Sequence, residues 1–310
     1  MKYDFERLKL LCGRATCLPP LPASVFRLME VTESSEFSAN QIAAITSADP
    51  MLCAKLMRAA NAGWDFAGMS RITSVQGAVM RLGLQAVRAM AISLGVQAMF
   101  TSRLAGCLFD PLCYARHSIV VGLLGRYIFA RCQMRGDVQS SMKVDEVFAA
   151  GVLHDLPVAL LAWVSPDAYD HVHVHCKGQG IAIEHGFKDI YGGSIRELGT
   201  RAIQTWGLPE AFEHTTLWVD EPLRAENEHE AIMAIHMASA VADTNIADSN
   251  GFASAPWSCP VEIDPEILMR IDLEQEELDT AFAAVLNQIE FYLPSSAMSS
   301  AVYLRGRRVA

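Results

Sequence analysis

Residues 144–157 read VDEVFAAGVLHDLP, an apolar segment that ends in a histidine and an aspartate. Its valines and phenylalanine lie on one stripe at helical spacing, which predicts a buried helix. His154 and Asp155 follow that helix directly. In a chain with nine histidines this dipeptide alone is not specific, so its meaning depends on the rest of the sequence.

Signals for helices recur along the chain. Ser38 and Gln41 form a capping-box pattern, and Asp49 with Pro50 supplies an N-cap and a proline at the first helical position. Alternation of apolar and polar residues, which is typical of strands, is almost absent. We therefore predict an all-α fold, a two-lobed helical bundle. Further predicted helices span residues 84–100, 114–131, 195–206, 209–218, 228–243 and 265–293.

Two interruptions divide the chain into three predicted segments. Residues 1–105 form an N-terminal helical lobe, residues 106–245 a second helical lobe, and residues 246–310 a linker with a C-terminal helical extension. The glycine, proline and polar residues of Thr101–Pro111 motivate the first boundary. The second follows from a stretch rich in Ser, Ala, Asn, Gly and Pro, Asn245–Pro260.

Residues 165–193 are rich in glycine and predict a long mobile loop or a small irregular subdomain. Within this region His171, His173 and His175 alternate with valines. In an extended segment the three imidazoles share one face and could bind one metal ion or sense protons. The alternative is a partly exposed strand or loop whose valines point inward.

Composition is that of a globular protein: 310 residues, of which 51% are hydrophobic. Lys and Arg total 25 against 35 Asp and Glu, so the net charge of −10 gives no overall attraction to nucleic acid or anionic membranes. No signal peptide is recognised, and the longest uncharged apolar stretch is shorter than the roughly 18 residues of a spanning helix. Eight cysteines without a Cys-x-x-Cys pair favour free thiols in a reducing compartment. We expect a cytoplasmic protein.

Residues 38–61 and 73–93 are each predicted as two short helices joined by a tight turn, the layout of a helix-turn-helix. The candidate recognition helix of the first pair offers only Lys55 and Arg58, and much of its surface is apolar. Ordinary helix packing is therefore favoured over a transcription-associated role on DNA.

Four side chains are candidates for a metal site. His117 lies on the predicted helix 114–131, Asp243 ends a later apolar helix, and His154 with Asp155 follows the buried helix. If the four converge, imidazoles suit borderline metals and carboxylates suit hard ones, so iron, manganese, zinc or magnesium would fit. The alternative is that these are polar residues at helix ends, hydrogen-bonded to backbone groups.

Several short motifs follow one another over about residues 15–245: LPPLP at 18–22, ITSADP at 45–50 leading into LMRAAN at 56–61, ITSV at 72–75 before RLG at 81–83, GVLHD at 151–155 and WGLPE at 206–210. Taken together, they resemble the HDOD (HD-related output domain) family. The resemblance implies an all-helical protein whose N-terminal part packs on a part similar to HD-superfamily metal phosphohydrolases. It also implies a bacterial signalling or output role, in a family whose biochemical activity is generally not established.

In the catalytic HD superfamily a His, a His-Asp pair and a later Asp hold the metal, and the resemblance assigns these positions to His117, His154, Asp155 and Asp243. Two positions depart from the pattern. Ile195 stands where related domains often carry a histidine, and Val219-Asp220 stands where many carry a His-His pair. The missing imidazoles predict either no cofactor or a single divalent ion, iron, manganese, zinc or magnesium. The sequence also shows no basic cluster beside the four candidates to bind phosphate.

These observations favour a signalling or output regulatory protein that acts through contact with a partner protein or a small ligand, without catalysis and without an assigned catalytic residue. The alternative is a metal-dependent phosphohydrolase acting on a nucleotide or another phosphate ester. Neither a membrane nor a nucleic acid is expected as a partner.

Overall fold

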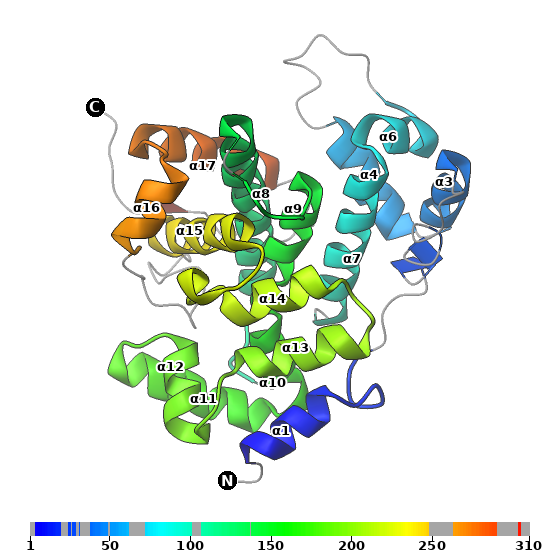
Figure 1. The fold of residues 1–310 in the computed structure, drawn as a ribbon. Helices are drawn as coiled ribbons and strands as arrows, with labels where there is room; N and C mark the ends of the chain where they lie inside the picture. The colour runs from blue at the N-terminus through cyan, green and yellow to red at the C-terminus, as the bar shows by residue number, and fades with distance from the viewer. Residues whose placement is uncertain are drawn as a thin grey trace.

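The computed structural model describes residues 4–19, 24–25, 27–28, 31, 38–48, 50–61, 72–100, 107–136, 138–247, 263–289 and 303–304. Helices make up nearly all of the regular structure in these ranges (Figure 1). The exception is one antiparallel pair of two-residue strands, β1 (Ile246–Ala247) and β2 (Tyr303–Leu304). The predicted all-α fold is confirmed.

Four helices from the first hundred residues pack on one another at the upper right of Figure 1. The capping box at Ser38 is present: its Oγ accepts a hydrogen bond from the Gln41 amide at 3.2 Å, and the Gln41 side chain accepts one from the Ser38 amide at 2.9 Å. The side chain of Asn61 bonds both backbone groups of Ile72, at 2.9 and 2.8 Å. The four helices are α3 (Ala39–Ser47), α4 (Pro50–Asn61), α6 (Val75–Leu82) and α7 (Leu84–Phe100).

A long helix, α8 (Pro111–Arg135), is the centre of the rest of the fold. Three helices pack along it: α9 (Val144–Leu153), α15 (His229–Asn245) and α17 (Gln275–Ile289). Because α9 also contacts α7, it joins this group to the N-terminal helices. The remaining elements are α1 (Phe5–Cys12), α10 (Leu156–Val164), α11 (Pro166–Gln179), α12 (Ile183–Tyr191), α13 (Arg196–Thr205), α14 (Glu210–Trp218), the 3-10 helix η1 (Pro222–Arg224) and α16 (Pro265–Ile271).

The backbones of α8 and α9 touch at two glycines. A Cβ added at Gly151 would lie 2.7 Å from Gly122 Cα, and one added at Gly122 would lie 2.7 Å from the carbonyl oxygen of Phe148. Side chains other than glycine would hold the helices further apart. Since His117 precedes Gly122 by five residues and His154 follows Gly151 by three, this crossing brings the two histidines together.

The helices α9 and α10 contain the most apolar segment of the described chain. By length and composition alone, Val144–Val164 could cross a membrane, but 89% of its apolar window is buried inside the protein. Every residue from Val147 to Leu153 and from Leu156 to Ala162 is buried. This segment therefore has the environment of core helices.

The predicted loop over residues 165–193 is wrong, because α11 and α12 occupy most of it. Pro166 begins α11 at a position where a proline fits the helix, and Gly180 ends it in the left-handed conformation, with φ of 68°. A buried stripe at helical spacing, which includes Tyr169, Val172 and Cys176, holds α11 on the core. The glycines that suggested a loop are in part the residues that end helices.

The three alternating histidines lie on α11 and not on an extended segment. Residues two apart on a helix point in directions about 200° apart, so the three imidazoles do not share a face. His173 is buried and stacks on Tyr169 with ring centroids 5.8 Å apart. His171 is exposed, and His175 Nε2 lies 3.4 Å from Asp189 Oδ2. The shared face that an extended segment would have given the three imidazoles is therefore not formed.

The N-terminal helix α1 packs against α13 and α10. Lys9 Nζ lies 2.7 Å from Glu197 Oε2, and the Trp163 indole N–H donates to the Cys17 carbonyl oxygen at 3.0 Å. These contacts tie the start of the chain to residues beyond 105. Residues 101–106 and 248–262, at the two predicted boundaries, lie outside the described residues, so the division into three segments stays a prediction.

Candidate metal centre

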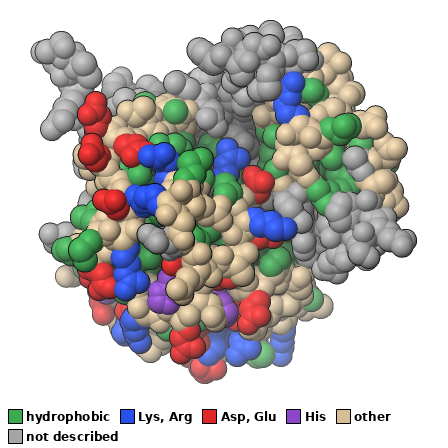
Figure 2. Space-filling model, turned by 45° about the horizontal axis from the view of Figure 1, so that its top comes forward, with side chains coloured by type: hydrophobic (Ala, Val, Ile, Leu, Met, Phe, Trp, Pro, Cys, Tyr) green, Lys and Arg blue, Asp and Glu red, His purple; other side chains and the backbone are tan. Residues whose placement is uncertain are grey.

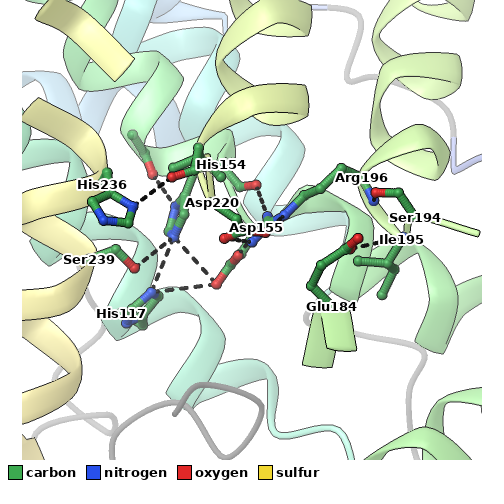
Figure 3. A network of polar contacts seen from close by, with 12 residues as sticks. His117, His154, Asp155, Glu184, Ser194, Ile195, Arg196, Asp220, His236 and Ser239 are labelled. Carbon is green, nitrogen blue, oxygen red and sulfur yellow. Dashed lines mark hydrogen bonds and ion pairs between the residues drawn. The ribbon is translucent and has the colours of Figure 1, made fainter. Parts of the chain in front are cut away.

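Two histidines and an aspartate meet in the core, where α8, α9 and the turn before α10 come together (Figure 3). The Nε2 atoms of His117 and His154 are 3.3 Å apart. Asp155 Oδ2 lies 3.5 Å from the Nε2 atom of His117 and 3.4 Å from that of His154. All three side chains are buried. The structure thus brings together three of the four predicted ligands.

Contacts at the far nitrogens indicate which nitrogen of each ring carries the proton. His154 Nδ1 lies 2.7 Å from the Gly151 carbonyl oxygen, to which only a protonated nitrogen can donate. His117 Nδ1 lies 3.3 Å from Asp243 Oδ1 without hydrogen-bond geometry, and a proton on Nδ1 is favoured because a lone pair there would face the carboxylate. In the neutral rings the Nε2 atoms then carry lone pairs. Both are available for a ligand beside Asp155 Oδ2.

Burial keeps these two imidazoles neutral. It lowers the pKa of His117 to about 3, although the Asp155 carboxylate acts in the opposite direction. Burial also lowers the pKa of His154, again against the effect of Asp155. Neutral imidazole is the form that binds metal ions, so at neutral pH both rings are ready to serve as ligands.

The three ligand atoms fit one metal ion. With metal–ligand bonds of about 2.1 Å, two ligands of a tetrahedral site lie about 3.4 Å apart. The separations of 3.3, 3.5 and 3.4 Å match that value. Lone pairs this close repel one another unless a cation or a proton lies between them. A bound ion at His117, His154 and Asp155 would act as a Lewis acid toward water or a ligand oxygen.

Asp243 lies at the other nitrogen of His117. Its Oδ1 contacts Nδ1, whereas His117, His154 and Asp155 form the group whose ligand atoms all lie within 4.8 Å of one another. A carboxylate at the far nitrogen of a ligand histidine orients the ring and raises its basicity. The two atoms are at ion-pair distance without hydrogen-bond geometry, and a role for Asp243 as a direct ligand stays a prediction.

Arg196, which sequence reasoning missed, supplies a positive charge to the site. Its Nη1 donates to Asp155 Oδ1 at 3.0 Å and to the His154 carbonyl oxygen at 2.8 Å. Its Nε and Nη2 donate to the two carboxylate oxygens of Asp220 at 2.6 and 2.8 Å. Burial opposes the charge of the guanidinium, but Asp220 and Asp155 outweigh burial and raise the pKa of Arg196. Asp155 therefore faces an arginine with one oxygen and two imidazoles with the other.

The sequence contained a signal for this ion pair. Arg196 directly follows Ile195, and Asp220 is the second residue of Val219-Asp220, the two places where the chain departs from the HD pattern. The linear sequence shows no basic cluster beside the four candidates, and the fold adds one buried arginine, not a cluster. Arg196 is 41 residues from Asp155 along the chain, and only the packing of α13 brings the two together.

A cavity of about 110 Å³ lies beside the cluster. Among the residues that line it, Arg196 is the only lysine or arginine. Glu184 accepts a hydrogen bond from the Ile195 amide at 3.0 Å, and burial raises the pKa of Glu184. Pockets for small ligands usually measure about 300–1,000 Å³, so this one suits an ion and its waters. The carboxylates that line it belong to Asp155, Glu184, Asp220 and Asp243.

The fold and this cluster define an all-helical protein with a His-Asp centre in its core. The sequence profile of the HDOD domain matches residues 18–222, more than half of the chain. The chain therefore belongs to the HDOD family. No curated protein matches it.

Solved structures share the fold at low sequence identity. An HDOD domain protein of unknown function from Geobacter sulfurreducens has a TM-score of 0.66 and 18% identity, over 92% of this chain and 90% of that chain. A candidate phosphohydrolase from Shewanella amazonensis SB2B has a TM-score of 0.64 and 18% identity, over 94% and 96%. A candidate signal transduction protein from Marinobacter aquaeolei VT8 has a TM-score of 0.62 and 17% identity, over 94% of this chain and 60% of that chain. Identities this low show a common fold and no more.

Proposed function

We propose that this chain is a signalling or output regulatory protein of the bacterial HDOD type, which acts by contact with a partner protein or a small ligand and not by catalysis. The observation that carries the proposal is that the guanidinium of Arg196 is already hydrogen-bonded within the protein. Its guanidinium donates to Asp155, to Asp220 and to the His154 carbonyl oxygen, so four of its five N–H donors already have acceptors within the protein. A phosphate ester would have to compete with two carboxylates for this cation.

The charge and size of the cavity support the same conclusion. Carboxylates outnumber the single arginine along its lining, so a phosphate anion would meet net repulsion. A volume of about 110 Å³ is also well below that of pockets which enclose a drug-sized or nucleotide-sized ligand. A divalent cation is favoured by both the charge and the size.

The proposed partner is another signalling protein, and the proposed compartment is the cytoplasm. The structural neighbour from Marinobacter aquaeolei is named for signal transduction, which lends support to a signalling role by analogy of fold. On the face of the molecule in Figure 2, basic and acidic side chains are interspersed and do not form one basic surface. Such a face favours a protein over nucleic acid as a partner.

An assay of phosphate release tests the proposal. Purified wild-type protein is offered a nucleotide panel and a simple aryl phosphate with Mn²⁺, Fe²⁺, Zn²⁺ or Mg²⁺, beside His154→Ala and, as a matched control, His171→Ala on the exposed face of α11. We expect the wild type to release no more phosphate than His154→Ala. Metal-dependent turnover by the wild type and His171→Ala that is lost in His154→Ala would overturn the proposal.

A metal-dependent phosphohydrolase is the second candidate. The observation in its favour is the His117, His154 and Asp155 cluster, whose spacing fits one divalent ion. An ion held there could activate a water molecule. For this candidate the salt bridge between Arg196 and Asp155 must open to admit a phosphate, so substrate binding should release Arg196 from Asp155.

A further inference from the structure

The two carboxylate oxygens of Asp155 have different neighbours. Oδ2 lies 3.5 and 3.4 Å from the two imidazole nitrogens, where one ion fits. Oδ1 lies 3.0 Å from Nη1 of Arg196. A carboxylate in this position can bridge two cations, one at each oxygen. Here the second of these places is taken by a guanidinium.

Arg196 is held firmly in that place. Its side chain is only 7% exposed, and it makes hydrogen bonds with Asp155, with both oxygens of Asp220 and with the carbonyl oxygen of His154. The paired contact with Asp220 is the planar two-point geometry that arginine forms with carboxylates. The guanidinium is thus a fixed positive charge in a buried site. Figure 3 shows it reaching Asp155 from the side opposite the imidazoles.

We propose that Arg196 stands in place of a second metal ion and limits the centre to a single divalent ion at His117, His154 and Asp155. A second ion at Asp155 Oδ1 would lie against the guanidinium, and the repulsion between two positive charges is stronger at a buried site than in bulk water. Both carboxylate oxygens of Asp220, the other acidic group at this arginine, also accept hydrogen bonds from it. This inference goes beyond the proposed function, because the number of ions depends on these residues whether or not a substrate is turned over.

The charge of residue 196, and not its shape alone, sets the number of ions. Arg196→Lys keeps a cation beside Asp155 but loses the two-point contact, so it should still admit one ion. Arg196→Gln removes the cation that repels a second ion at Asp155 and Asp220, so it should admit two. Arg224→Gln is the matched control, because Arg224 pairs with Glu221 on the surface.

Titration with Mn²⁺, followed by calorimetry and by electron paramagnetic resonance of the bound ion, measures the number of ions directly. We expect one Mn²⁺ per chain for the wild type, Arg196→Lys and Arg224→Gln, none for His154→Ala, and two magnetically coupled ions for Arg196→Gln. Zero or two ions in the wild type contradict the proposal, and so does one ion in a folded Arg196→Gln protein. If Arg196→Gln does not fold, the wild-type and Arg196→Lys counts still decide, because two ions in either contradict it. An ion count that contradicts this proposal does not decide the proposed function, which the phosphate-release assay tests separately.

Discussion

Gly151 and Gly122 meet backbone to backbone at the crossing of α9 and α8, where a Cβ on Gly151 would come within 2.7 Å of Gly122 Cα. This contact matters to the metal centre because the carbonyl oxygen of Gly151 also lies 2.7 Å from His154 Nδ1. One glycine therefore sets both the distance between two core helices and the orientation of a ligand histidine.

Substitution of Gly151 by alanine should destabilise the protein. The added methyl group meets backbone atoms of α8 that cannot rotate away, so we expect a loss of about 1–3 kcal/mol in the free energy of unfolding. Urea denaturation followed by circular dichroism measures the change. Gly178→Ala is the matched control, because no atom lies within 4 Å of a Cβ at this position on α11. It should leave stability unchanged or raise it by up to about 1 kcal/mol, and equal losses in both variants would contradict the close contact.

The two partners in the Arg196–Asp220 ion pair should differ in their effect on stability. Arg196→Gln leaves Asp155 buried without its cation, so we expect a loss of about 3–5 kcal/mol. The side chain of Asp220 is 40% exposed, so water can replace some of the hydrogen bonds that its carboxylate accepts from Arg196. Asp220→Asn should therefore lower the free energy of unfolding by about 1 kcal/mol or less. Chemical denaturation of the two variants beside Arg224→Gln provides the measurement. A larger loss for Asp220→Asn than for Arg196→Gln would show that the ion pair is not organised as described.

Removal of metal should have little effect on the fold. The centre is surrounded by core helices, and Arg196 balances the negative charge of Asp155 at Oδ1 even when no ion is bound. We expect the melting midpoint in the presence of a chelator to fall by less than about 10 °C, the scale of several kcal/mol for a domain of this size. Differential scanning calorimetry of the Mn²⁺-loaded and chelated protein makes the comparison. A larger fall would assign the ion a structural role.

The protein should lose stability in mild acid in part through His173 on α11. Burial lowers the pKa of His173 below 6.5, with Lys177 adding to the effect and Asp170 opposing it. As the pH falls through 6.5, the unfolded chain takes up a proton at this residue and the folded chain does not, so stability is lost on the acid side. Between pH 6.5 and 5.5 the contribution is at most about 1.4 kcal/mol. Unfolding free energies of wild type and His173→Gln across this range should converge as the pH falls, and parallel curves would contradict the prediction.

Much of the fold could be predicted from local pattern. The capping box at Ser38, the apolar stripe of α9 and the helical spacing in α8 are short-range signals, and each corresponds to a helix in the structure. The glycines of residues 165–193 misled the prediction, because they were given more weight than the buried stripe that includes Tyr169, Val172 and Cys176. Local spacing favours a helix or a strand, but it does not rank two patterns that overlap.

The candidate centre was predictable only in part. His154 and Asp155 stand together at the end of a buried helix, so the sequence marks them, whereas their approach to His117 depends on the contact of Gly122 with Gly151. The role of Arg196 depends on the packing of α13 against α10, which no local pattern contains. Residues missing from a family pattern were visible in the sequence, but the ion pair that takes their place required the three-dimensional structure.

A crystal structure of the protein soaked with Mn²⁺ and inorganic phosphate tests the central claim most directly, because anomalous scattering locates each ion. The account predicts one Mn²⁺ bound by His117, His154 and Asp155, with Arg196 still on Asp155 and Asp220 and no phosphate in the cavity. A phosphate bound between the ion and a displaced Arg196 would contradict it and would identify the centre as a phosphohydrolase site.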